Sequence, residues 1–103
     1  MRIALDFDET YTRDPKLWNS FIQEAKDRGH EVYVVTMRYD NQEADSVRKA
    51  LDGLIDGYVF TGREFKRKYV NENTCLTIDV WIDDTPEFIT GVPRLILPHK
   101  PRE

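Results

Sequence analysis

The chain has 103 residues, of which 40% are hydrophobic and 33% charged, and its formal net charge is −4. This length allows one domain, residues 1–103, around one hydrophobic core. No apolar run approaches the roughly 18 residues of a membrane span. A single cysteine, Cys75, excludes an intramolecular disulfide and a cysteine zinc cluster. Since the N-terminus carries no export signal, we expect a cytoplasmic protein. The net negative charge argues against a general nucleic-acid binder.

Short apolar runs alternate with amphipathic helical segments, which is the pattern of a parallel α/β sheet. Residues 3–5 predict a first strand, buried on both faces because the apolar run is almost unbroken. Asp14 and Pro15 are suited to begin a helix that ends near Gly29. Residues 32–35 then predict a second strand, because they are rich in β-branched and aromatic side chains.

The rest of the chain continues this alternation. It predicts a helix over residues 40–52, a strand over 58–60, a helix over 63–72 and a strand over 80–82. One short helical turn over residues 86–90 and a fifth strand over 94–97 follow. Pro98 and Pro101 favour a frayed tail over residues 98–103. Right-handed crossovers between parallel strands then give a three-layer α/β sandwich with a sheet of about five strands.

Carboxylates follow two of the predicted strands. The sequence DFDET, residues 6–10, comes directly after the first strand, and Asp83 and Asp84 directly after the fourth. In open α/β sheets, ligands bind beyond the carboxyl ends of the strands, so reactive groups belong there. Adjacent carboxylates repel each other, and a cation such as Mg²⁺ relieves that repulsion. Taken singly, each acidic pair is equally consistent with a solvated turn.

A hydroxyl and a group of cations complete the candidate site. Thr36 closes the second strand, where a hydroxyl and free backbone N–H groups suit phosphate oxygens. Four cations open the predicted third helix, namely Arg63, Lys66, Arg67 and Lys68. Most of them belong on a solvated helix face, but one can turn toward the pocket.

In chain order these signals are a strand then DFDET, a strand then a threonine, a lysine, and a strand then two aspartates. This order resembles the four-motif signature of the haloacid dehalogenase (HAD) superfamily over nearly the whole chain. The resemblance implies a HAD-like Rossmannoid fold with strand order 3-2-1-4-5. It also implies a Mg²⁺-dependent phosphatase that hydrolyses phosphate monoesters through an aspartyl-phosphate. The first and fourth strands are then neighbours, about 4.8 Å apart, so the two acidic motifs meet.

The resemblance assigns a role to each acidic residue. Asp6 is the expected nucleophile. Asp8 is expected to protonate the leaving oxygen and then to take a proton from the attacking water. Mg²⁺ would bind Asp6, the backbone carbonyl of Asp8, and Asp83 or Asp84, and the sequence does not decide between the last two.

The resemblance also assigns roles to a lysine and two threonines. Thr36 and the lysine would hold the remaining phosphoryl oxygens, and Thr10 would support the loop after Asp8. We expect this lysine to be Lys66, because it lies nearer the predicted start of the third helix. Lys68 lies about 200° further round that helix, so the two cannot both point inward.

The spacing of the motifs leaves no room for a cap domain. Only 25 residues separate Thr10 from Thr36, and 29 separate Thr36 from Lys66. The resemblance therefore implies a small capless phosphatase with an open site, which is commoner among relatives that act on bulky or macromolecular phosphates. Arg38 and Arg63 are candidates for contacts at the rim, although both are equally consistent with ordinary surface residues. The substrate, small or macromolecular, is left open.

Three alternative functions are considered. A response-regulator receiver domain also uses acidic residues, a hydroxyl, a lysine and Mg²⁺, but its phosphorylated aspartate follows the third strand, where this chain has Phe60-Thr61-Gly62. A HAD-fold binding module without activity would lack catalytic residue types, all of which are present here. A nucleic-acid end phosphatase is a subclass of the main interpretation, permitted by the cations of residues 63–68 and weakened by the net negative charge.

Overall fold

The computed structural model describes residues 1–92. Within them, four strands form one parallel sheet in the order β3-β2-β1-β4. The strands are β1 (Arg2–Leu5), β2 (Glu31–Thr36), β3 (Gly57–Phe60) and β4 (Val80–Ile82). The predicted α/β class with a parallel sheet is confirmed. The sheet has four strands in the described residues, not five, and the strand predicted over residues 94–97 and the tail predicted over 98–103 lie outside them.

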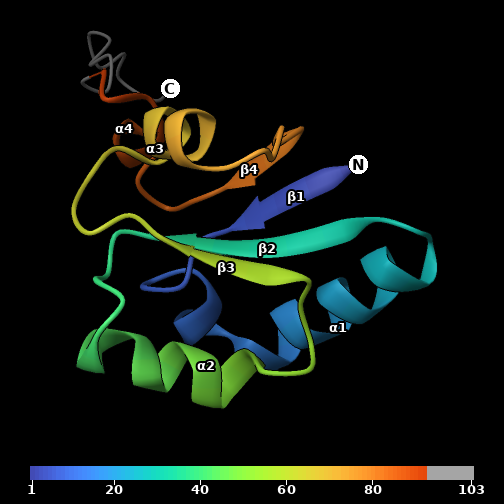
Figure 1. Ribbon diagram of the computed structural model, residues 1–103. Helices are drawn as coiled ribbons and strands as arrows, with labels where there is room; N and C mark the ends of the chain where they lie inside the picture. The colour runs from blue at the N-terminus through green and yellow to red at the C-terminus, as the bar shows by residue number, and fades with distance from the viewer. Residues whose placement is uncertain (93–103) are drawn as a thin grey trace, which may run out of the picture.

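Helices cover both faces of the sheet, which forms the middle of three layers (Figure 1). One face carries α1 (Pro15–Asp27) and α2 (Asp45–Leu51), and the other carries α3 (Lys66–Asn73) and α4 (Glu87–Thr90). Alternating side chains of β1 supply both interfaces, because successive residues of a strand point to opposite faces. Ile3 and Leu5 join the larger core, whereas Ala4 joins the core that contains Val70 of α3.

The predicted helices exist, but two of them begin differently. The helix expected from about residue 40 begins as a short 3-10 helix, η2 (Gln42–Ala44), with the Asn41 side chain accepting the N–H of Glu43. The helix expected from residue 63 begins only at Lys66, because Arg63 has a left-handed φ of 71°, which is incompatible with a helix. The N–H of Arg63 instead donates to the carbonyl of Met37 at 2.8 Å, which ties this turn to the segment after β2.

The segments on either side of Thr36 form helices and strands of the α/β domain. Between Thr10 and Thr36 the chain forms η1 (Tyr11–Arg13), α1 and most of β2, and between Thr36 and Lys66 it forms η2, α2 and β3. No helix among the described residues is long and apolar enough to span a membrane.

Candidate active site

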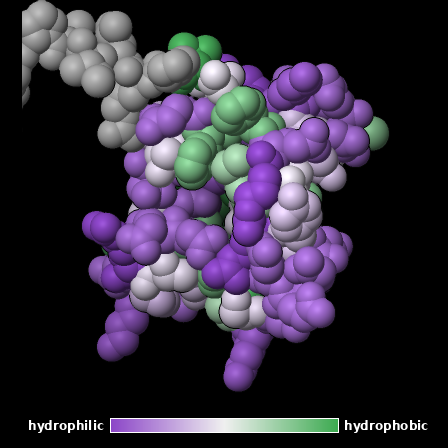
Figure 2. All heavy atoms as spheres, turned by 90° about the vertical axis from the view of Figure 1, so that its left-hand side faces the viewer, coloured by the Kyte–Doolittle hydropathy of each residue, from purple (hydrophilic) through white to green (hydrophobic). Residues whose placement is uncertain are grey.

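The candidate site lies at the carboxyl ends of β1 and β4, beside the first turn of α3. Leu5 lies opposite Ile82, and the N–H of Asp6 donates to the carbonyl of Ile82 at 2.9 Å. This pairing brings the acidic motif after β1 beside the one after β4. Figure 2 looks onto this end of the molecule and shows hydrophilic residues over most of the face, with a smaller apolar area above them.

A buried lysine joins two of the carboxylates. The Nζ atom of Lys66 lies 2.8 Å from Oδ1 of Asp6 and 2.5 Å from Oδ2 of Asp83. Lys66 is the first residue of α3 and is only 1% exposed. Lys68, in contrast, is exposed and lines a different pocket on the outside of α3. Of the two lysines considered from the sequence, the structure therefore brings Lys66 to Asp6.

Thr10 connects the two acidic motifs. Its hydroxyl lies 3.1 Å from Oδ2 of Asp6 and 3.3 Å from Oδ1 of Asp84, and its oxygen accepts the N–H of Asp84 at 3.2 Å. One hydroxyl proton serves one carboxylate at a time. The oxygens of Asp83 are engaged differently, one by Lys66 and the other by the N–H of Thr85 at 2.9 Å. Thr10 therefore contacts both motifs, whereas the sequence suggests only a support for the loop after Asp8.

A pocket of about 130 Å³ opens over these groups. Its walls combine carboxylates, a lysine, threonine hydroxyls and an aromatic ring. The residues that line it are Asp6, Asp8, Glu9, Thr36, Met37, Lys66, Asp84, Thr85 and Phe88. This volume is well below the roughly 300–1,000 Å³ of pockets that enclose a whole drug-sized ligand. It suits a phosphoryl-sized group, so the remainder of a ligand would lie outside.

Sequence reasoning missed several wall residues. Glu9, Met37 and Thr85 directly follow motif residues, and this adjacency is a signal that could have identified them. Phe88 has no such signal, because it belongs to the short helix α4 that returns over the pocket after β4.

The two arginines suggested for the rim have partners inside the molecule. Arg38 donates to both carboxylate oxygens of Asp8, with Nε–Oδ2 at 3.0 Å and Nη2–Oδ1 at 2.7 Å. Arg63 donates to the carbonyl of Met37 at 2.8 Å and pairs with Glu43 at 3.0 Å. Neither arginine is among the residues that line the pocket in the described part of the chain. Arg38 thus contacts the candidate acid, Asp8, and 24% of its side chain remains exposed.

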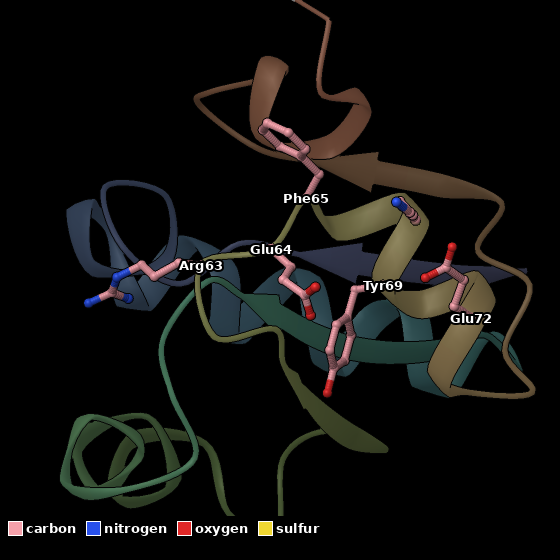
Figure 3. A pocket seen from close by; sticks show the side chains of 6 residues that line it. Arg63, Glu64, Phe65, Tyr69 and Glu72 are labelled. Atoms are coloured by element: carbon pink, nitrogen blue, oxygen red, sulfur yellow. The ribbon is translucent and has the colours of Figure 1, made fainter.

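The cations of residues 63–68 do not form one basic surface. A pocket of about 260 Å³ on the outside of α3 is lined by both signs of charge and by two aromatic rings, from Arg63, Glu64, Phe65, Lys68, Tyr69 and Glu72 (Figure 3). Figure 3 shows the Arg63 side chain directed away from the other labelled side chains. Lys66 points inward to Asp6. This mixture of charges differs from the continuous basic surface that a nucleic-acid backbone attracts.

Three carboxylates gather around this lysine. Asp6, Asp83 and Asp84 each present an oxygen within 4.8 Å of the others. Burial raises the pKa of Asp6 to about 7, against the opposing attraction of Lys66. Burial also acts to raise the pKa of Asp84, but hydrogen bonds from Asp6, Thr10 and Thr85 outweigh it and lower that pKa below its ordinary value. A proton on Asp6, or a bound cation, therefore relieves the excess negative charge of the cluster.

Comparisons with known proteins give no family assignment for the chain. A scan against protein-family models, a search of curated proteins and a search of solved structures each found no significant match.

The raised pKa of Asp6 predicts that the metal-free protein is less stable at pH 8 than at pH 5. Asp6 keeps its proton in the folded chain up to about pH 7, whereas an unfolded aspartate loses it near pH 4. The stability that this proton provides is present at low pH and is lost as the pH rises through about 7. We expect the Tm in EDTA to fall by at least about 4 °C, which corresponds to about 1 kcal/mol in a domain of this size.

The Asp6→Asn variant cannot ionise at this position, so its Tm should change less between pH 5 and pH 8. The matched control is Asp45→Asn, on the exposed first turn of α2, which should keep the slope of the wild type. An equally steep slope in Asp6→Asn would assign the pH dependence to other groups.

Proposed function

We propose that this chain is a Mg²⁺-dependent phosphatase of the HAD type, which hydrolyses phosphate monoesters through an aspartyl-phosphate at Asp6. The observation that carries the proposal is the contact of Asp6 with buried Lys66 at 2.8 Å, in a pocket that Asp8 and Thr36 also line. A carboxylate nucleophile needs adjacent positive charge, because it approaches a phosphate group of its own charge sign. The order of the motifs along the chain supports the same function. With it we propose the strand order 3-2-1-4-5 and a cytoplasmic location.

The proposed reaction has two steps in which atoms and protons balance. In the first, a carboxylate oxygen of Asp6 bonds to phosphorus as the ester P–O bond breaks, and Asp8 gives its proton to the leaving oxygen. In the second, water attacks phosphorus and loses a proton to Asp8, and the bond between phosphorus and Asp6 breaks. Inorganic phosphate leaves, and both carboxyl groups return to their starting states.

Lys66 and Thr36 are suited to hold the phosphoryl oxygens during these steps. Lys66 is held by two carboxylates at the helix start, and Thr36 is buried at the end of β2. Positive charge and hydrogen-bond donors that are already in place stabilise the transition state without having to reorganise. The hydroxyl of Thr10 contacts both Asp6 and Asp84 and so helps to hold the two carboxylates near each other.

The acidic cluster fits a magnesium ion. Three carboxylate oxygens within 4.8 Å of one another match the oxygen ligands that Mg²⁺ prefers, alongside water. Asp84 is better placed than Asp83 as a direct ligand, because Asp84 lines the pocket and Asp83 does not. The oxygens of Asp83 are held by Lys66 and by the N–H of Thr85, whereas those of Asp84 contact the hydroxyls of Thr10 and Thr85 at 3.3 Å. A bound Mg²⁺ would reduce the repulsion between the phosphate and the attacking carboxylate.

The alternative functions have weaker support. A receiver domain would need an aspartate after β3, but the residue there is Thr61, which is buried and donates its hydroxyl to the carbonyl of Glu64. A binding module without activity would have no use for Asp8 at the pocket wall. A nucleic-acid end phosphatase would gain little from residues 63–68, since Glu64 and Glu72 accompany the cations there.

Asp6→Asn is expected to lower phosphatase activity by about a thousandfold or more, because the remaining pathway has no covalent nucleophile. Phosphate release with Mg²⁺ is measured across sugar phosphates, nucleotides and 3′- or 5′-phosphorylated oligonucleotides, with Asp45→Asn as the control that keeps full activity. More than about a tenth of the wild-type rate in Asp6→Asn would reject Asp6 as the nucleophile. Wild-type protein that hydrolyses none of these substrates would favour the binding module.

Asp84→Asn is expected to weaken Mg²⁺ binding about tenfold or more, because a neutral amide replaces a charged oxygen ligand. Calorimetric titration of Mg²⁺ without substrate measures this independently of activity. Glu9→Gln is the matched control, since Glu9 lines the same pocket but pairs with Arg13 at 3.2 Å. Unchanged affinity in Asp84→Asn, or an equal loss in both variants, would place the metal elsewhere.

A further inference from the structure

We infer that Arg38 is a positioning residue, which holds the carboxyl group of Asp8 where it can serve the leaving oxygen. This inference rests on the phosphatase activity proposed above. It begins with two parallel hydrogen bonds, from Nε of Arg38 to Oδ2 of Asp8 at 3.0 Å and from Nη2 to Oδ1 at 2.7 Å. A bidentate pair of this kind fixes both the place and the plane of a carboxylate.

The guanidinium group of Arg38 is itself fixed by partners from other segments. Its Nη1 donates to the carbonyl of Glu43 at 2.6 Å and to the hydroxyl of Ser46 at 2.8 Å. Its central carbon lies 5.1 Å from the centre of the Phe7 ring, a distance suited to a cation–π contact. Arg38 therefore links the loop after β1 to η2 and to the start of α2.

Asp8 needs such a support more than Asp6 does. About half of the Asp8 side chain is exposed (52%), whereas Asp6 is buried and contacts Lys66. Asp8 also stands before Glu9, whose φ of 64° is left-handed, in the loop where the chain leaves β1. An exposed carboxyl group samples several rotamers, and only some of them bring an oxygen to the leaving group.

Proton delivery requires one of the two hydrogen bonds of the pair to open. The freed oxygen of Asp8 then carries the proton to the leaving oxygen, while the other oxygen keeps its hydrogen bond from Arg38 and holds the carboxyl group in place. Since Arg38 is not among the described residues that line the pocket, it acts on the reaction through Asp8 and not by contact with the phosphoryl group.

Two substrates separate this role from phosphate binding. An alkyl phosphate such as glycerol phosphate has a leaving oxygen that needs a proton, whereas p-nitrophenolate leaves readily without one. Arg38→Ala should lower kcat about tenfold to a hundredfold on glycerol phosphate and less than about threefold on p-nitrophenyl phosphate. The first loss is smaller than the roughly 10²- to 10⁴-fold that a general acid contributes, because Asp8 itself is still present. Asp8→Asn should show the same pattern with a larger loss. The double variant should be no slower than Asp8→Asn, because the two residues act as one unit.

Arg48→Ala is the matched control, since Arg48 also pairs with an aspartate, Asp40 at 2.8 Å, and lies over the ring of Phe60. It should leave both rates unchanged. Arg38→Lys keeps the charge but cannot form the bidentate pair, so it should lose activity on glycerol phosphate alone, to a smaller extent than Arg38→Ala. Thermal unfolding of each variant establishes that the fold is retained.

An equal loss on both substrates in either Arg38 variant would overturn the inference, since it would indicate phosphate binding or a general structural role. Faster hydrolysis of glycerol phosphate by Arg38→Ala would also overturn it, because Arg38 would then restrain Asp8. If the wild-type protein hydrolysed neither substrate with Mg²⁺, that result would contradict the proposed phosphatase function and therefore this inference as well.

Discussion

The rest of the site depends on one buried ion-pair group, Lys66 between Asp6 and Asp83. Burial of a lysine is unfavourable unless its charge is paired, and here the paired oxygens lie at 2.8 and 2.5 Å. The group joins the ends of β1 and β4 to the start of α3. A buried ion pair generally contributes little more stability than apolar residues of similar volume would. Stability alone therefore does not explain these ion pairs, whose direct effect is to hold a positive charge against Asp6.

The loops around the pocket are connected by a second set of charged contacts. Arg38 joins the segment after β2 to the loop after β1 through Asp8, and Arg63 joins the turn after β3 to the segment after β2 through Glu43. Close packing supports the second connection, because a side chain at Gly62 would come within 2.9 Å of the Tyr39 ring. The ends of β1, β2 and β3 thus share one network of contacts beside the pocket of about 130 Å³.

Much of this arrangement could be predicted from the sequence. Apolar patterning identifies each described strand to within about a residue. The family resemblance carried by the acidic, hydroxyl and lysine motifs implies which strand ends converge. The long-range contacts outside these motifs could not be predicted. The left-handed φ of Arg63 depends on a carbonyl 26 positions away, at Met37, and the pairing of Arg38 with Asp8 spans 30 positions. Phe88 reaches the pocket only through the path of the chain after β4.

In the proposed reaction, Asp6 becomes covalently phosphorylated. The most direct test stops the wild-type protein with acid during a single turnover with Mg²⁺ and substrate and then treats it with borodeuteride. This reagent reduces an aspartyl-phosphate to a deuterium-labelled homoserine with release of phosphate, and mass spectrometry locates that label. We expect the label on the peptide that contains Asp6, rising and decaying at rates that account for phosphate release. Turnover in which the label is found on another residue, or on none, would contradict the account.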